Sequence, residues 1–295
     1  MLSRITSSTI SQQAVRTLQA GLAERAKLQD QAASQRAIRT PSDDPARAAT
    51  ILNVHGEQAR TAQYARNITD ALAWAGSADT ALAASADLLA RARDLTVQGA
   101  NSGALNPAAR EAIAAELDSL GRELLSKADT TLLGRTIFAG TTDAGTAFDP
   151  DTFAFQGVPA ASVERRVGAN EKVRVDLDGA EVFGEGTTSV FATLKGIAAD
   201  LRAGAAVAPR LAQLDAHVSD LAAARGAIGA RTAQIERASA ANASAAVDLE
   251  ARRVEAENVD TVEVYVALQA AELVYQSALQ VTAKSLQATL LEFLR

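Results

Sequence analysis

The sequence predicts a mainly α-helical protein: a long coiled-coil or bundle rod built from both chain ends, with a small β-rich insertion in the middle. Three observations support this fold class. Ala is abundant, whereas aromatic residues make up only 4% of the chain, which suits long, closely packed helices better than a thick globular core. Apolar residues recur at three- and four-residue steps in both halves. Between residues 136 and 190 this periodicity stops, and Gly, Thr and Phe gather instead.

Composition and charge argue against several classes of protein. The net charge of −6 is spread along the chain, so there is no basic footprint for nucleic acid. No apolar run is long enough to cross a membrane, and the first residues lack the apolar centre of a signal peptide. Because Cys is absent, disulfides, thiol catalysis and Cys-ligated metals are excluded.

The chain is expected to begin with a helical assembly arm, residues 1–40. A helix is predicted over about 3–36, with Val15, Leu18 and Leu22 on one face. This arm carries an excess of basic residues and the carboxyl-terminal arm an excess of acidic ones, which weakly favours pairing of the two ends.

The helical rod is expected to comprise residues 41–135 and 196–257. The prolines at 41 and 45 interrupt the first arm, and Asp44 before Pro45 is a good helix start, predicting a helix over about 45–100. Asn106 before Pro107 starts another helix by the same logic. Metal binding or acid catalysis by the aspartates at 43 and 44 is an alternative, but no other ligand residues converge nearby in the sequence.

Residues 136–195 are expected to form the small β-rich insertion. Lys172–Leu177 alternates polar and apolar residues, which is typical of a strand, and Val163–Val167 and Val182–Phe183 are weaker candidates. The aspartates of this region lack the ligand spacing of an EF-hand, so turn formation explains them better than calcium binding.

A heptad pattern marks the second half of the rod. Six residues follow one another at strict seven-residue intervals: Leu214, Leu221, Ile228, Ile235, Asn242 and Leu249. Such a repeat favours coiled-coil-like packing, in which Asn242 would fix the register at some cost in stability.

The second assembly arm is expected at residues 258–295. Asp260 and Glu263 form a capping-box pattern, and no Pro or Gly follows. One apolar stripe consists of Leu268, Ala271, Tyr275, Leu279, Ala283, Leu286, Leu290 and Phe293. Off this stripe lie further apolar residues: Val262, Val266, Leu273, Val274 and Val281. A helix apolar on most of its circumference must be buried on most of it, either against its own chain or against other copies.

The chemistry of an active site is missing from the sequence. The two histidines, His55 and His217, each stand alone on a predicted helix without metal-ligand spacing and are expected at the surface. No phosphate loop, nucleophile elbow or dinucleotide fingerprint is present. We therefore expect no catalytic residue, cofactor or metal, and the chain is not expected to be an enzyme.

Five stretches of the sequence carry a resemblance to a known family. They are Arg4-Ile5-Thr6, Pro41–Pro45, Tyr64–Ile68, Thr136–Thr141 and the ending Ser285–Arg295. Together with the order of helical ends and central insertion, they show that the chain resembles the bacterial flagellin superfamily.

The resemblance implies a structural protein of the bacterial flagellum at the junction between hook and filament, packed through its terminal helices. The assembly interface would include Val15, Leu18, Leu22, Leu268, Tyr275, Leu279, Leu286, Leu290 and Phe293. Implied partners are other copies, a neighbouring hook-associated protein, flagellin and a cytoplasmic export chaperone. The protein would be extracellular, exported by the flagellar type III apparatus without a cleaved signal. Its arms would be poorly ordered in the free chain and become helical on assembly.

Three other readings remain open. A short flagellin, the bulk filament subunit, is the nearest alternative. An intracellular coiled-coil scaffold would have well-folded ends in solution, and a helical-bundle enzyme would need the site chemistry that the sequence lacks.

Overall fold

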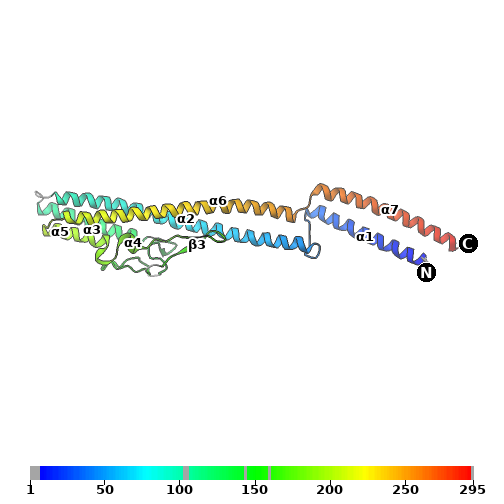
Figure 1. Ribbon diagram of the computed structural model, residues 1–295, viewed down its shortest axis with the longest axis horizontal. Helices are drawn as coiled ribbons and strands as arrows, with labels where there is room; N and C mark the ends of the chain where they lie inside the picture. The colour runs from blue at the N-terminus through cyan, green and yellow to red at the C-terminus, as the bar shows by residue number, and fades with distance from the viewer. Residues whose placement is uncertain (1–6, 102–105, 143–144, 159–160, 294–295) are drawn as a thin grey trace. The chain divides into compact units, whose positions relative to one another are not determined.

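The computed structural model describes residues 7–101, 106–142, 145–158 and 161–293 (Figure 1). The chain forms two compact units, one of residues Arg60–Ala245 and one that combines Met1–Ala59 with Ala246–Arg295. Long helices dominate both units, and the strands form small two-stranded sheets, so the predicted fold class is confirmed.

Two long helices contribute to both units: α2 (Pro45–Ala100) and α6 (Leu211–Glu257). The heptad pattern of α6 is confirmed by burial, because Leu214, Leu221, Ile228 and Ile235 are each at most 2% exposed. Asn242, the polar residue of this seam, donates through Nδ2 to the carbonyl oxygen of Thr61 on α2 at 3.2 Å. This bond accounts for a polar residue in an otherwise apolar seam.

Two shorter helices complete the helical part of the unit Arg60–Ala245. Helix α3 (Pro107–Ala128) begins as predicted, because the side chain of Asn106 accepts a 2.8 Å hydrogen bond from the amide of Ala109. Helix α5 (Val190–Ala203) starts at a Ser189 cap and ends at Gly204, whose positive φ of 70° suits glycine. Helices α3 and α5 pack closely together.

The insertion is built from short elements. Its strands are β3 (Glu164–Arg166) and β4 (Lys172–Arg174), followed by helix α4 (Gly179–Phe183) and the 3₁₀ turn η1 (Gly186–Thr188). The hairpin of β1 (Thr131–Leu132) and β2 (Arg135–Thr136) leads into it, and a second 3₁₀ turn, η2 (Ala208–Arg210), lies between α5 and α6. The two pairs are antiparallel, with Thr131 opposite Thr136 and Arg165 opposite Val173.

Three features of this region differ from the sequence prediction. The weak strand candidate Val182–Phe183 was wrong: it belongs to helix α4, whose first turn is capped by the side chain of Asp178. Strand β4 ends at Arg174 rather than continuing to residue 177. Helix α5 begins at Val190, inside the expected insertion, because one short apolar segment packs as a helix on α3.

Aromatic rings form the core of the insertion. Phe183 lies 5.3 Å from Phe138, 6.1 Å from Phe148 and 5.9 Å from Phe191, measured between ring centroids. All four rings are at most 2% exposed. The contacts with Phe138 and Phe148 are edge-on and the one with Phe191 is stacked. Such ring contacts add to the hydrophobic gain, so the small insertion has a dense core despite its short strands.

Polar contacts fasten the β3–β4 hairpin to the rod helices. Asn67 of α2 donates to the carbonyl oxygen of Arg166 at 2.7 Å. Arg165 pairs with Asp70 of α2. From α6, Gln234 donates to Glu171, between β3 and β4, at 3.1 Å, and Arg231 donates to the carbonyl oxygen of Asp176, two residues after β4, at 2.6 Å. The hairpin is thus held by both long helices.

In the other unit, helix α1 (Ser7–Ser34) and helix α7 (Thr261–Phe293) pack along each other and run in opposite directions (Figure 1). The helix predicted for each chain end is confirmed.

Candidate functional site: an assembly interface on the terminal helices

The contact between α1 and α7 follows three- and four-residue steps on both helices. On α1 the half-buried residues of this seam are Ala14, Leu18, Gly21, Arg25 and Leu28. On α7 the buried or half-buried residues, among those whose side chains are described, are Val264, Ala267, Leu268, Ala271, Tyr275, Ala278 and Thr282. This spacing is typical of coiled-coil packing.

Tyr275 is the largest side chain of the seam. A Cβ atom on Gly21 would lie 3.4 Å from the Tyr275 ring, so glycine leaves room for it. The guanidinium carbon of Arg25 lies 5.8 Å from the ring centroid, within cation–π range. The seam therefore joins one large ring to small residues and has few large apolar side chains.

The structure divides the predicted interface residues into three groups. Leu18, Leu268 and Tyr275 lie in the seam between α1 and α7. Val15, Leu22 and Leu279 lie outside it and are 48%, 52% and 42% exposed. The side chains of Leu286, Leu290 and Phe293 lie outside the described residues.

A second apolar face of α7 is uncovered in the single chain. Its members are each more than 60% exposed: Val262, Val266, Leu273, Val274 and Val281. At 100° per residue, Val262, Val266 and Leu273 lie opposite the seam with α1. Burying such a side chain is worth about 1.5–3 kcal/mol, so this face favours association.

Two short segments, which we call the passages, connect the arm helices to the rod helices: residues 35–44 lie between α1 and α2, and residues 258–260 lie between α6 and α7. Hydrogen bonds tie the two passages to each other. Gln35, next after α1, has a positive φ of 56°, and its carbonyl oxygen accepts a 3.2 Å hydrogen bond from Val259. Ala37 donates its amide to the carbonyl oxygen of Glu257, the last residue of α6, at 2.8 Å. Arg36 and Asn258 form an antiparallel bridge between these bonds.

Aspartate side chains cap the first turns of α2 and α7, the helices that follow the two passages. Asp44 accepts a 2.9 Å bond from the amide of Arg47 at the start of α2. Asp260 accepts from Val262 at 2.8 Å at the start of α7. Asp43 stabilises the turn that precedes α2 by accepting hydrogen bonds from the amides of Thr40 and Arg39. The bond from Thr40, and then that from Arg39, lowers the pKa of the Asp43 carboxyl group. These bonds satisfy backbone groups, which explains the aspartates without metal binding or catalysis.

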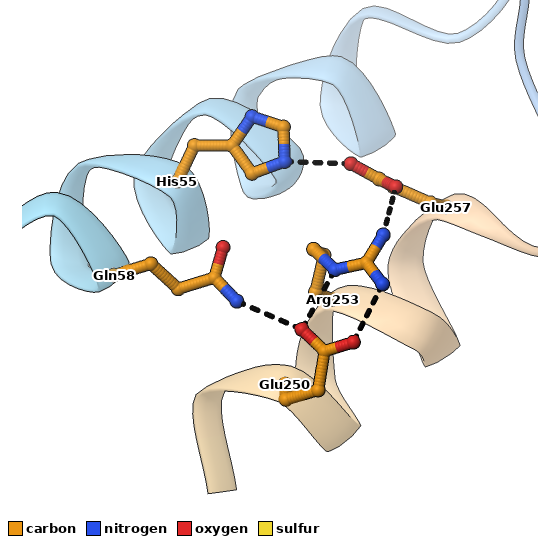
Figure 2. Close-up of polar contacts among 5 residues, drawn as sticks. All are labelled: His55, Gln58, Glu250, Arg253 and Glu257. Atoms are coloured by element: carbon orange, nitrogen blue, oxygen red, sulfur yellow. Dashed lines mark hydrogen bonds and ion pairs between the residues drawn. The ribbon is translucent and has the colours of Figure 1, made fainter. Parts of the chain in front are cut away.

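Five side chains at the end of α6 and the start of α2 form a polar network (Figure 2). Arg253 bonds Glu250 through two atoms, at 2.6 and 2.8 Å, and Glu257 at 2.6 Å. Each glutamate also reaches α2: Glu250 accepts from Gln58 at 3.1 Å, and Glu257 lies 2.6 Å from Nε2 of His55.

Sequence reasoning missed this network. His55 was expected as an isolated surface residue; it is half exposed but paired. The three- and four-residue spacing from Glu250 to Arg253 to Glu257 was a signal for ion pairing along one helix. The other histidine, His217, is half-buried and lies 3.2 Å from the hydroxyl of Thr193 on α5.

Within the described ranges, no group of three or more His, Cys, Asp or Glu side chains is arranged to hold a metal ion. None of the described helices has the length and apolar character of a membrane-spanning segment.

The first comparison is with the models of protein families. Residues 5–143 match the bacterial flagellin N-terminal helical region. The resemblance to the flagellin superfamily is thereby confirmed.

Within that class, the chain resembles flagellar hook-associated protein 3. It is 26% identical to that protein of Escherichia coli (strain K12) over 218 residues, which cover 74% of this chain and 68% of the relative. With that of Salmonella typhimurium it shares 27% over 187 residues, 63% of this chain and 58% of the relative.

Solved structures show the same fold. A putative flagellar hook-associated protein from Vibrio parahaemolyticus aligns with a TM-score of 0.68 and 21% identity, over 73% of this chain and all of that one. The flagellar junction protein of Legionella pneumophila aligns with a TM-score of 0.59 and 15% identity, over 71% of this chain and all of that one.

Proposed function

We propose that this chain is a structural subunit of the bacterial flagellum that assembles at the junction between hook and filament. The similarity to hook-associated protein 3 favours this role over that of a short filament flagellin. The main support for assembly is the uncovered apolar face of α7, which includes Val262, Val266 and Leu273. Other copies of the chain would bury this face. A catalytic role is not part of the proposal.

In this proposal the terminal helices do two jobs. The seam through Leu18, Leu268 and Tyr275 pairs the two arms of one chain, while the exposed face of α7 meets neighbouring copies. Val15, Leu22 and Leu279 belong to the outward-facing set with partial exposure. Leu286, Leu290 and Phe293 continue the arm toward its end. Next to the ring of copies lie another hook-associated protein and flagellin, and a cytoplasmic chaperone covers the arm before type III export to the cell exterior.

Immunogold electron microscopy on intact flagella tests the location, with an antibody raised against the insertion, residues 140–190. A single spot where hook meets filament is expected. Label along the whole filament would show that the chain is a short flagellin. Absence of label from every flagellum would contradict the proposal and favour the intracellular coiled-coil scaffold.

Leu273→Glu tests the interface. The residue is 66% exposed in the single chain, so its free fold should be unchanged. In an assembled, apolar contact the same charge would be unpaired, at a cost of several kcal/mol. Complementation of a deletion strain should therefore fail, and Leu286→Glu or Leu290→Glu should fail likewise. Gln276→Glu adds the same charge at an exposed position of α7 and serves as the matched control. Normal junctions with Leu273→Glu would disprove the α7 interface.

A further inference from the structure

The unit that carries the arms has a thin apolar core. Its buried hydrophobic residues, among those described, are Ala37, Ala48, Val54, Leu249 and Val264. Three of these five cluster where α2 begins and α6 ends. Few and small apolar contacts give the start of α2 and the end of α6 little support within this unit.

We infer that the network of His55, Gln58, Glu250, Arg253 and Glu257 is a clasp that holds the start of α2 to the end of α6 and stops fraying of the arms from spreading into these two helices. The arms are the part of the chain with uncovered apolar surface and few buried residues, which are the marks of low local stability. The clasp joins the helix that follows the first arm, α2, to the helix that precedes the second arm, α6.

Arg253 is the centre of the clasp (Figure 2). Its guanidinium group holds Glu250 one turn earlier and Glu257 one turn later on α6, and both carboxylates then face α2. The hydrogen bonds to Glu250, and next those to Glu257, raise the pKa of Arg253. Bidentate, charge-assisted bonds of this kind restrict geometry more than a single lysine–carboxylate pair would.

Glu257 joins the clasp to the passages between the helices. Its side chain meets Arg253 and His55, while its carbonyl oxygen accepts the amide of Ala37. Its side chain is only 18% exposed, so solvent screens this pair less than a surface pair. One residue thus ends α6, contacts α2 and anchors the segment that follows α1.

Hydrogen exchange on the purified full-length chain tests the inference. In the unaltered chain, backbone amides of residues 45–58 and 246–257 should exchange more slowly than those of α1 and α7. Arg253→Met keeps the length of the side chain but removes its bonds. Exchange in these two segments should then become about tenfold faster, because three charge-assisted hydrogen bonds between partly exposed side chains are lost. Residues 60–245 should be unaffected.

The matched control is Arg252→Met, at the preceding position of α6, which is exposed and takes no part in the bonds of the network. It should leave exchange unchanged. Glu257→Gln, which keeps the shape of the side chain, should give an intermediate acceleration. The fluorescence of the single tryptophan, Trp74, which is 3% exposed, verifies that the rest of each variant is folded. Equal exchange in Arg253→Met and Arg252→Met, or unprotected segments in the unaltered chain, would overturn the inference.

A second readout uses the absence of cysteine from the chain. Bridged residues on antiparallel strands lie within disulfide range, so Arg36→Cys with Asn258→Cys should oxidise readily to an intramolecular disulfide. Adding Arg253→Met should slow its formation, whereas adding Arg252→Met should not. An equal rate in both would show that the passages are held without the clasp. Neither experiment depends on the flagellar role. A failure of the clasp inference can therefore be distinguished from a failure of the proposed function.

Discussion

The two units of this chain differ in how much of their own surface they can bury. In the unit Arg60–Ala245, Leu, Ile and Phe side chains are fully buried, and even the carboxylate of Asp176 is enclosed, where it accepts bonds from Arg174 and from the amide of Val163. In the arm unit, the seam relies on small residues, and valines and a leucine of α7 face solvent. The difference separates a unit that buries its large apolar side chains within itself from one that leaves an apolar helix face uncovered.

The largest effect should come from the aromatic core of the insertion. Phe183→Ala removes a ring that contacts three others and should lower the free energy of unfolding by about 3–5 kcal/mol. Urea unfolding followed by Trp74 fluorescence measures the change. Val266→Ala on α7 is the comparison from the arm unit: since Val266 is 61% exposed, the unfolding midpoint should stay the same while assembly weakens. Equal loss of stability in both variants would break the distinction between the units.

The long helices could be predicted because their signals are local and repeated. The start of α2 at Pro45, the start of α3 after Asn106 and the heptads from Leu214 to Leu249 follow from capping residues and period alone.

The insertion and the clasp could be predicted only in part, because their contacts join residues far apart in sequence. Val182 and Phe183 have strand propensity, yet the Asp178 cap and the contact with Phe138 and Phe148 favour a helical turn. The clasp joins α2 to α6, and no local pattern pairs His55 with Glu257.

A smaller effect is expected at the start of the arm helix α7. Asp260→Ala removes the side chain that accepts from the amides of Val262 and Glu263, at a cost of about 1 kcal/mol. Because the arms have little other support, this loss should appear as reduced helix content by circular dichroism. The unfolding midpoint reported by Trp74 should not move. A shifted midpoint would mean that the arm and the stable body unfold together.

A gain in stability is expected at the tip of the β1–β2 hairpin. Leu133 has a positive φ of 51° and is 88% exposed, so a leucine here is both strained and unburied. Leu133→Asn suits this conformation and should raise the free energy of unfolding by up to about 1 kcal/mol, measured by urea unfolding. Leu132→Asn, at the neighbouring paired position, is the control and should not stabilise. An unstable Leu133→Asn variant would mean that the leucine makes contacts that its exposure does not reveal.

The smallest effect concerns pH and again lies in the stable unit. Burial lowers the pKa of His217 below the ordinary value of 6.5, with the nearby Asp220 opposing the shift. The unfolded chain then binds a proton more readily than the folded chain, so stability is complete above the unfolded pKa and declines as the pH falls below about 6.5. The decline ends once the pH is below the folded pKa. His217→Gln keeps a polar partner for Thr193 but removes this titration. The difference in unfolding free energy between the two proteins, measured with Trp74 fluorescence from about pH 8 to about pH 5.5, should move against the unaltered chain as the pH falls, because all other titrating groups cancel. A constant difference would show that His217 is as accessible to protons in the folded chain as in the unfolded one.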